Sequence, residues 1–386
     1  MDWGAVIEQT IRTTKGNITR FQDRFPHVSN GDARYQLVNH TDWTEGFWPG
    51  ILWLSYEYGK DPFIHDAAVR SVHSFQTRLA QKKDLDHHDI GFLYSLSAKA
   101  QWIVEREESA KDTALQAADA LMKRWRPASR LIQAWGAESD PQNGGRIIID
   151  CLMNLPLLYW ATGQTGDSAY ADAARIHADK SRRFLVRGDD SSYHTFYFDP
   201  LSGDSVRGGT HQGFRDGSTW TRGQAWGIYG FALAYRYFRD PQFLDTAQRM
   251  ARYFIAHLPE DHVAHWDFDV PRTESTPRDS SASAIACCGM LEIADQLSDG
   301  DSSRDFFLDA VRRTMVSLVN GYFTAGSPNE EGFLRHGSYF VRGGIAPDDF
   351  VIWGDYFFLE ALMRLNNGIP GYWYEREGND AIEAAP

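Results

Sequence analysis

The chain has 386 residues, of which 42% are hydrophobic and 14% aromatic, so it can bury a large core. Its formal net charge of −13 repels polyanions, and no concentrated basic patch offsets it, which argues against a nucleic-acid partner. The N-terminal sequence MDWGAVIEQT lacks the features of a secretory signal, and no apolar run is long enough to span a bilayer. We therefore expect a cytoplasmic protein with no membrane partner, present as a monomer or a dimer.

Cysteine usage is consistent with that location. Cys151, Cys287 and Cys288 are odd in number and have no CxxC spacing, which suits neither a disulfide framework nor a zinc site. We expect all three to be buried as small hydrophobic side chains.

From the N-terminus onward, a charged amphipathic segment is followed by an apolar, aromatic one, and this alternation occurs six times. The amphipathic segments cover 4–22, 61–80, 108–125, 167–186, 241–257 and 302–319. In the same order, the apolar segments are GFWPGILWLSYEY, DIGFLYSLSAKAQWIV, IIIDCLMNLPLLYWA, TRGQAWGIYGFALAYRYF, SASAIACCGMLEIADQL and WGDYFFLEALMRL. Helical spacing of the apolar residues predicts that all twelve segments are helices.

The two kinds of segment predict two layers. An amphipathic helix has one face in water, whereas a helix that is apolar nearly all round must be surrounded by protein. Six helical hairpins closed into a ring form an all-α (α/α)6 barrel, which we expect as a single catalytic domain over 1–375 with a disordered tail over 376–386. An open helical solenoid is the alternative, and the similar polar and aromatic starts of the apolar segments favour the ring.

In a ring, those starts meet at one mouth, together with long loops at 187–221, 259–279 and 324–351. Tryptophan faces match the C–H faces of sugar rings. Trp43 and Trp220 lie among Asp, Thr and Ser, which favours a binding role. Trp48 and Trp353 fit the core equally well.

Asp150 is the strongest catalytic candidate. It follows Ile147–Ile149 and precedes Cys151, so little water should reach it, and desolvation raises the pKa of a carboxyl group. Hydrolysis of a sugar needs such a protonated acid. A helix cap, or an ion pair with Arg146, would explain Asp150 without catalysis.

Asp89 also lies at a predicted helix start, where a cap is the ordinary explanation. His87 and His88 precede it, but no third ligand follows at a familiar spacing, so we expect no metal. For an acidic sugar, Arg222 in STWTRGQAW is the best-placed cation, although it would suit a structural aspartate equally well. His194, His211 and Gln212 lie in the loop before it.

Several strings resemble the unsaturated glucuronyl hydrolases of glycoside hydrolase family 88. They are NHTDWTEGFWPGILWL, LDHHDIGFLYSLSAKAQW, NGGRIIIDCLMNLPLL, RGDDSSYHTFYFDP, GGTHQG, DGSTWTRGQAWGIYGFAL, RDSSASA and IWGDYFFLEAL. The likeness extends from about residue 35 to residue 375. It implies an (α/α)6 barrel that needs no metal or organic cofactor.

The resemblance also implies a reaction on a small acidic unsaturated oligosaccharide. Polysaccharide lyases leave products ending in a 4,5-unsaturated uronic acid, and the family removes this sugar by hydrating the double bond. The match assigns Asp150 as the proton donor that also helps to activate water, and Asp89 as the residue that holds the ring hydroxyls. The implied substrate contacts are Trp43, Trp220 and Trp226 as stacking walls, His194, Gln212 and Arg222 as polar contacts, and Tyr339 on the leaving-sugar side. His88, beside Asp89, is a further predicted contact.

One departure bears on specificity. Members that favour sulfated fragments carry a Ser-x-x-Ser-x-Lys run before the last inner helix, where this chain reads VRGGIAPDDFVIWGD. No lysine is there to meet a sulfate, which favours unsulfated chondroitin, hyaluronan or exopolysaccharide products, although Arg342 could substitute. The alternatives are an unsaturated rhamnogalacturonyl hydrolase, an inverting glycosidase on a similar barrel, and a catalytically inactive sugar-binding protein.

Overall fold

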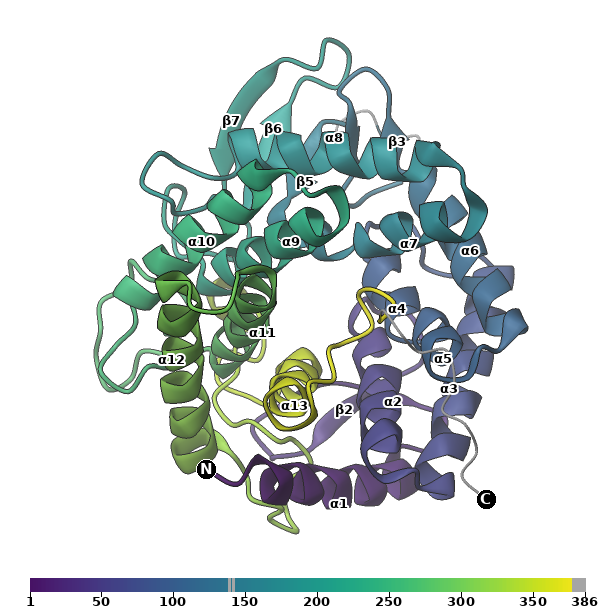
Figure 1. Ribbon diagram of the computed structural model, residues 1–386, viewed down its shortest axis with the longest axis vertical. Coiled ribbons are helices and arrows are strands. Elements are labelled where there is room, and N and C mark those ends of the chain that lie inside the picture. The colour runs from purple at the N-terminus through teal and green to yellow at the C-terminus, as the bar shows by residue number, and fades with distance from the viewer. Residues whose placement is uncertain (138–139, 141–142, 377–386) are drawn as a thin grey trace.

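The computed structural model describes residues 1–137, 140 and 143–376, and its helices form a closed ring of two layers (Figure 1). The last inner helix packs against the first helices of the chain and so closes the ring. The outer helices are α1 (Trp3–Phe21), α3 (Pro62–Ala80), α6 (Glu108–Met122), α8 (Ser168–Phe184), α10 (Pro241–Ala256) and α12 (Ser302–Ser317). This architecture confirms the predicted (α/α)6 barrel.

The inner layer follows the six apolar segments. Its helices are α2 (Phe47–Gly59), α4 (Ile90–Ser95) with α5 (Ala98–Glu105), the 3-10 helix η2 (Ile149–Met153) with α7 (Pro156–Thr165), α9 (Thr221–Phe238), α11 (Ser280–Gln296) and α13 (Ile352–Asn367). Every residue is buried from Thr221 to Ala234 in α9 and from Ser280 to Ala294 in α11. The three cysteines are buried and unpaired, as expected.

Aspartates cap five of the six outer helices, and Glu107 caps α6. Asp61 accepts a hydrogen bond from the Phe63 N–H at 2.9 Å, and Asp240 accepts one from Gln242 at 3.1 Å. In both helices a proline occupies the first position, where its missing N–H costs nothing. The Asp-Pro pairs therefore fix the helix starts that the sequence indicates.

The third inner segment departs from a single helix. Pro156 has no N–H and its ring would collide with the carbonyl of Leu152 in a continuous α-helix. The chain instead forms the short helix η2 and restarts at Pro156. Asp150 is therefore the second residue of η2, which directly follows the strand that ends at Ile148.

Short strands shape the mouth. β1 (Phe25–Ser29) pairs with β2 (Tyr35–Val38), and β3 (Trp125–Arg126) pairs with β4 (Leu131–Ile132). The antiparallel sheet β5-β6-β7 is formed by Arg146–Ile148, Thr195–Phe198 and Ser205–Gly209. Its register pairs Ile148 with Thr195, which brings the segments before η2 and before α9 together.

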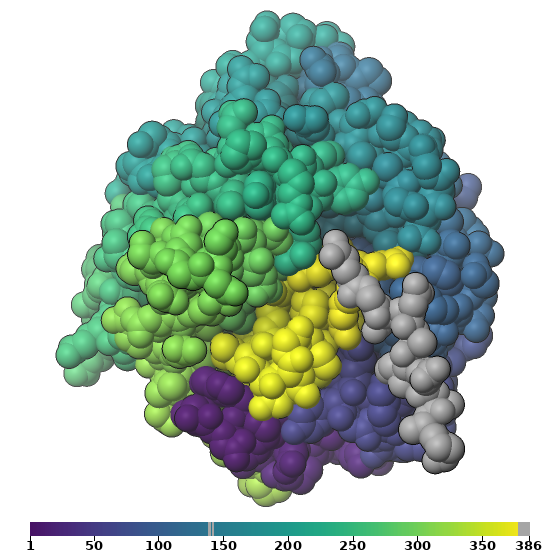
Figure 2. Space-filling view, in the orientation of Figure 1, coloured from purple at the N-terminus to yellow at the C-terminus, as the bar shows by residue number. Residues whose placement is uncertain are grey.

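The opposite end of the ring is covered by the C-terminal segment, residues 368–376, shown in yellow near the centre of the face in Figure 2. Arg376, which the sequence placed in the tail, forms an ion pair with Glu57 at 3.0 Å. The rest of the predicted tail, 377–386, lies outside the described residues. None of the described helices combines the length and apolar composition needed to cross a membrane.

Candidate active site

A cavity of about 540 Å³ lies where the inner helices begin. Its wall comes from the starts of α2, α4, η2, α9 and α13 or the segments that precede them, which are five of the six starts predicted to meet there. The start of α11 contributes no residue to the lining. The lining residues are Thr41, Asp42, Trp43, His87, His88, Asp89, Trp135, Arg146, Ile148, Asp150, His194, His211, Gln212, Tyr339, Phe340 and Ile345.

Asp150 lies in the first turn of η2 and reaches the cavity. Its Oδ1 is shielded from solvent and has no hydrogen-bond partner among the described residues. Burial, and then the charge of Asp89, raises the pKa of Asp150 to about 7, against a smaller lowering by Arg222. Ile148, not Asp150, caps η2, and within the described part of the chain no ion pair joins Asp150 to Arg146. Both non-catalytic explanations of Asp150 therefore fail.

Asp89 occupies the cap position of α4 without making a side-chain capping bond. Its carboxylate instead meets His88 at 3.4 Å, His87 at 3.5 Å and the Asn154 amide at 3.3 Å. Burial alone would raise the pKa of Asp89, but His88, His87 and Asn154 together hold it below its ordinary value. The two aspartates are thus shifted in opposite directions, which suits one of them to donate a proton and the other to remain charged.

His194 and Gln212 form the side of the cavity before α9. The His194 Nδ1 accepts hydrogen bonds from the backbone N–H groups of His211, at 3.0 Å, and Gln212, at 3.3 Å. Burial, then the charges of His211 and Arg222, lowers the pKa of His194 well below its ordinary value. A neutral imidazole that accepts at Nδ1 carries its proton on Nε2, so His194 is a hydrogen-bond donor there.

Trp43 and Tyr339 form an aromatic corner of the cavity. The Trp43 indole donates to the Tyr339 hydroxyl at 3.2 Å, and the ring of Trp353 supports Trp43 from behind at 5.2 Å. The amide of Gln212 donates to the Tyr339 carbonyl at 3.2 Å. Trp353 and Trp48 are buried, so both belong to the core.

Three of the predicted sugar contacts, Trp220, Trp226 and Arg222, are not among the residues that line this cavity. Trp220 is 3% exposed and packs beneath His194, with ring centres 4.5 Å apart. Trp226 is fully buried between Phe92 and Phe357. Because α9 is apolar on all sides, its first turns pack against neighbouring helices.

Arg222 is the third of these residues. Its guanidinium pairs with Asp279 at 2.8 Å, donates to the carbonyl of Tyr339 at 2.8 Å and to that of Ser338, and lies 4.4 Å from the ring of Trp220. Arg222 is therefore paired with a structural aspartate, which is the alternative that the sequence left open. Arg222 supports the segment that carries the Tyr339 ring.

Two residues that line the cavity, Trp135 and Arg146, are not predicted as substrate contacts by the sequence. The sequence indicates Arg146 only as a possible ion-pair partner of Asp150. The Arg146 guanidinium lies 4.9 Å from the Trp135 ring and 5.2 Å from the Tyr197 ring. The usable signal was an isolated tryptophan in the loop before GGRIII. The pairing of β5 with β6, which brings Tyr197 there, had no such signal.

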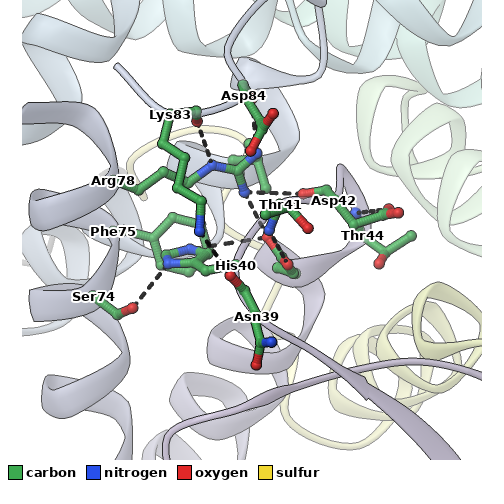
Figure 3. Close-up of polar contacts among 12 residues, drawn as sticks. Asn39, His40, Thr41, Asp42, Thr44, Ser74, Phe75, Arg78, Lys83 and Asp84 are labelled. Atoms are coloured by element: carbon green, nitrogen blue, oxygen red, sulfur yellow. Dashed lines mark hydrogen bonds and ion pairs between the residues drawn. The ribbon is translucent and has the colours of Figure 1, made fainter. Parts of the chain in front are cut away.

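Two loops of the cavity wall are joined by one buried arginine. Arg78, near the end of α3, donates to the carbonyls of Asp42 and Asp84, both at 2.9 Å, and to the carboxylate of Glu45 (Figure 3). Glu45 in turn accepts the Thr41 N–H at 2.7 Å. The loop that carries Trp43 and the loop that leads to Asp89 are thus held by the same side chain.

Comparisons with known proteins identify the family of the chain. Residues 17–363 match Glycosyl Hydrolase Family 88. An unsaturated glucuronyl hydrolase from Bacillus sp. (strain GL1) is 62% identical over 374 residues, covering 97% of this chain and 99% of that protein, and its crystal structure matches with a TM-score of 0.96. An unsaturated chondroitin disaccharide hydrolase from Streptococcus pyogenes serotype M1 is 40% identical, covering 95% of this chain and 92% of that protein.

Another similar solved structure is that of an unsaturated glucuronyl hydrolase with dGlcA-Glc-Rha-Glc. That chain is 61% identical, with a TM-score of 0.96, and the match covers 97% of this chain and all of the other. The resemblance inferred from the sequence is confirmed by the family match and by identity over nearly the whole length. The chain belongs to glycoside hydrolase family 88 and is a glycoside hydrolase.

Proposed function

We propose that this enzyme releases the terminal 4,5-unsaturated uronic acid from oligosaccharides made by polysaccharide lyases. The observation that carries the proposal is the pair of aspartates in the cavity, with Asp150 shifted toward its protonated form and Asp89 toward its charged form. The names of the Bacillus and Streptococcus relatives support the same reaction class.

The proposed reaction begins with proton transfer from Asp150 to C4 of the double bond. Positive charge then develops on C5 and is shared with the ring oxygen. The Asp150 carboxylate that remains takes a proton from water as the water oxygen bonds to C5, so one carboxyl group serves as acid and then base. The resulting hemiketal opens by breaking the bond from C5 to the ring oxygen. The hemiacetal left at C1 then expels the leaving sugar.

The rest of the cavity has matching roles. Asp89, which stays charged, accepts hydrogen bonds from the ring hydroxyl groups of the sugar and stabilises the positive charge at C5. His88 and His194 line the cavity with the two aspartates and act as neutral polar contacts, since burial lowers the pKa of both imidazoles, that of His88 to about 4. Trp43 and Tyr339 offer an aromatic corner for the faces of the sugars.

The preferred substrates are unsulfated products of chondroitin, hyaluronan or bacterial exopolysaccharides. The segment before α13 has no lysine, and the solved relative with dGlcA-Glc-Rha-Glc supports the exopolysaccharide class. Arg342 is exposed on that segment and is the one side chain there that would favour a sulfate.

The test is to incubate the protein with an unsaturated chondroitin disaccharide and to follow the ultraviolet absorbance of the double bond. We expect the absorbance to disappear as the amino sugar is released. A matched substrate with rhamnose as the leaving sugar tests the alternative of an unsaturated rhamnogalacturonyl hydrolase. Such an enzyme would turn over the rhamnose substrate faster than the chondroitin disaccharide. Binding of the disaccharide without loss of absorbance would indicate an inactive sugar-binding protein.

A further inference from the structure

A buried amide links the two aspartates. The Asn154 Nδ2 lies 3.3 Å from the Oδ1 of Asp89 and 3.3 Å from the backbone carbonyl of Asp150. Its Oδ1 accepts the backbone N–H of Phe92 at 2.7 Å, so the amide orientation is set by a hydrogen bond to α4. Asn154 is fully buried and does not line the cavity.

The backbone leaves Asn154 little freedom. A Cβ atom placed on Gly91 would lie 2.3 Å from the Cα of Asn154, so the start of α4 and the end of η2 touch at backbone distance. The Asn154 N–H also donates to the carbonyl of Cys151 at 2.8 Å. Because α4 carries Asp89 at its start and η2 carries Asp150, this contact sets the separation of the two carboxyl groups.

We propose that Asn154 is a positioning residue for the reaction: its amide donates both to the carboxylate of Asp89 and to the backbone carbonyl of Asp150, and so holds the two segments at a fixed separation. This inference rests on the proposed function, in which Asp89 acts as a carboxylate and Asp150 as an acid. Neither role needs Asn154 to touch the sugar.

Two histidines act on the same carboxyl group, and His88 and His87 lower the pKa of Asp89 more than the Asn154 amide does. Burial lowers the pKa of His88 to about 4, so its positive charge is present only in acid, whereas the amide donates at every pH. Arg222 lowers the pKa of Asp150. The titratable groups that interact electrostatically with one or both of the aspartates include His87, His88, Cys151, Arg222 and Tyr339. Of the side chains that donate hydrogen bonds to Asp89, only Asn154 is an amide with no charge of its own to titrate.

The test compares the pH dependence of kcat/KM for two variants on the unsaturated disaccharide. Asn154→Ala removes a hydrogen-bond donor to Asp89 and so raises the pKa of that carboxyl group. The acidic limb of the pH profile, which reports the ionisation of Asp89, should therefore move up by about half a pH unit to one unit. Asn154→Asp keeps the acceptor for Phe92 but replaces the donor with a carboxylate. Its charge disfavours ionisation of both aspartates, so both limbs should move upward.

Asn17→Ala is the matched control, because Asn17 is also buried and donates to the carbonyl of Glu331 at 2.8 Å, far from the cavity. It should lower the melting temperature without moving either limb. If both Asn154 variants keep the wild-type limbs, the inference is overturned, even where the rate is lower. If Asn154→Ala does not fold, the two limbs of Asn154→Asp decide alone. Failure of the proposed function would look different, since the wild-type protein itself would leave the double bond intact.

Discussion

At the two ends of the barrel, the pKa of a half-buried carboxyl group is shifted in opposite directions. At the mouth, Asp150 has one oxygen without a partner, and burial raises its pKa to about 7. At the far end, Glu375 accepts from Trp102 at 2.8 Å, Trp160 at 2.7 Å, Gln164 at 2.9 Å and Arg106 at 2.8 Å. Burial is outweighed there by these donors, and the pKa of Glu375 lies below its ordinary value.

The size of a cavity and the state of its carboxyl groups are independent at the two ends of the barrel. The far end contains the larger cavity, about 810 Å³, yet its carboxylates are engaged in holding the C-terminal segment. Glu360, for example, accepts from the Trp373 indole at 3.0 Å. Cavity size therefore does not mark the reactive end. The reactive end is marked instead by Asp150, which lines a cavity, has a raised pKa and has an oxygen without a hydrogen-bond donor among the described residues. Burial also raises the pKa values of Glu45 and Asp355 to about 7, but both accept hydrogen bonds from neighbouring groups.

Asp150→Asn should give the largest effect. The amide cannot deliver a proton, so kcat should fall by about a thousandfold or more. Asp150 contributes stability only while it is protonated, and this contribution is lost as pH rises from its unfolded-state pKa through about 7. The variant should therefore melt at or above the wild-type temperature at pH 8. A variant with substantial turnover, or one that is clearly less stable at pH 8, would contradict the role of Asp150.

Arg78→Met should come next. It leaves Glu45 buried without its partner and frees the two mouth loops, so unfolding should cost roughly 3 to 5 kcal/mol less and kcat/KM should fall about tenfold to a hundredfold. Arg364→Met is the matched control at the far end, where the buried Arg364 pairs with Glu292 at 2.8 Å. It should lose similar stability and keep kcat/KM in the folded fraction. Equal losses of activity in both would remove the distinction between the two ends.

Arg222→Ala and Asp279→Ala test how the mouth meets the acidic sugar. Arg222 supports the carbonyl of Tyr339 and is paired with Asp279, so both variants should raise KM, by a similar factor of about five to fifty. Michaelis constants measured on the unsaturated disaccharide give the answer. A large rise in Arg222→Ala with none in Asp279→Ala would show that Arg222 contacts the uronate directly.

Glu375→Gln should have the smallest effect on catalysis. It weakens the four hydrogen bonds at the far end, so the melting temperature should fall by about 1 to 3 °C while kcat/KM stays unchanged. Calorimetry together with the absorbance assay measures both. A tenfold loss of kcat/KM would show that the far end influences the mouth.

Most of the fold was predictable because the period of apolar residues distinguishes the two layers directly. The Asp-Pro pairs at Asp61 and Asp240 gave helix starts that the structure reproduces. The interruption of the third inner helix was less visible, although Pro156 is its cause. The spacing of apolar residues predicts which segments are helical, but a proline determines where a helix is interrupted.

The candidate site was predictable where a residue's neighbours in the sequence form its surroundings. Asp150 lies among isoleucines in both the sequence and the structure, and this determines its protonation. Trp226 and Arg222 were harder, since helix rotation and the distant Asp279 place them behind the wall. Asn154 gave no signal, because its role as we propose it comes from a contact with the neighbouring inner helix α4, which lies about 60 residues earlier in the chain.

The most direct test of the account uses an unsaturated chondroitin disaccharide beside the same disaccharide with its double bond hydrogenated. Release of the amino sugar is measured for the wild-type protein and for Asp150→Asn. We predict that the wild-type protein cleaves only the unsaturated substrate and that the variant cleaves neither. Cleavage of the hydrogenated disaccharide at a comparable rate would contradict proton delivery to the alkene as the basis of the reaction.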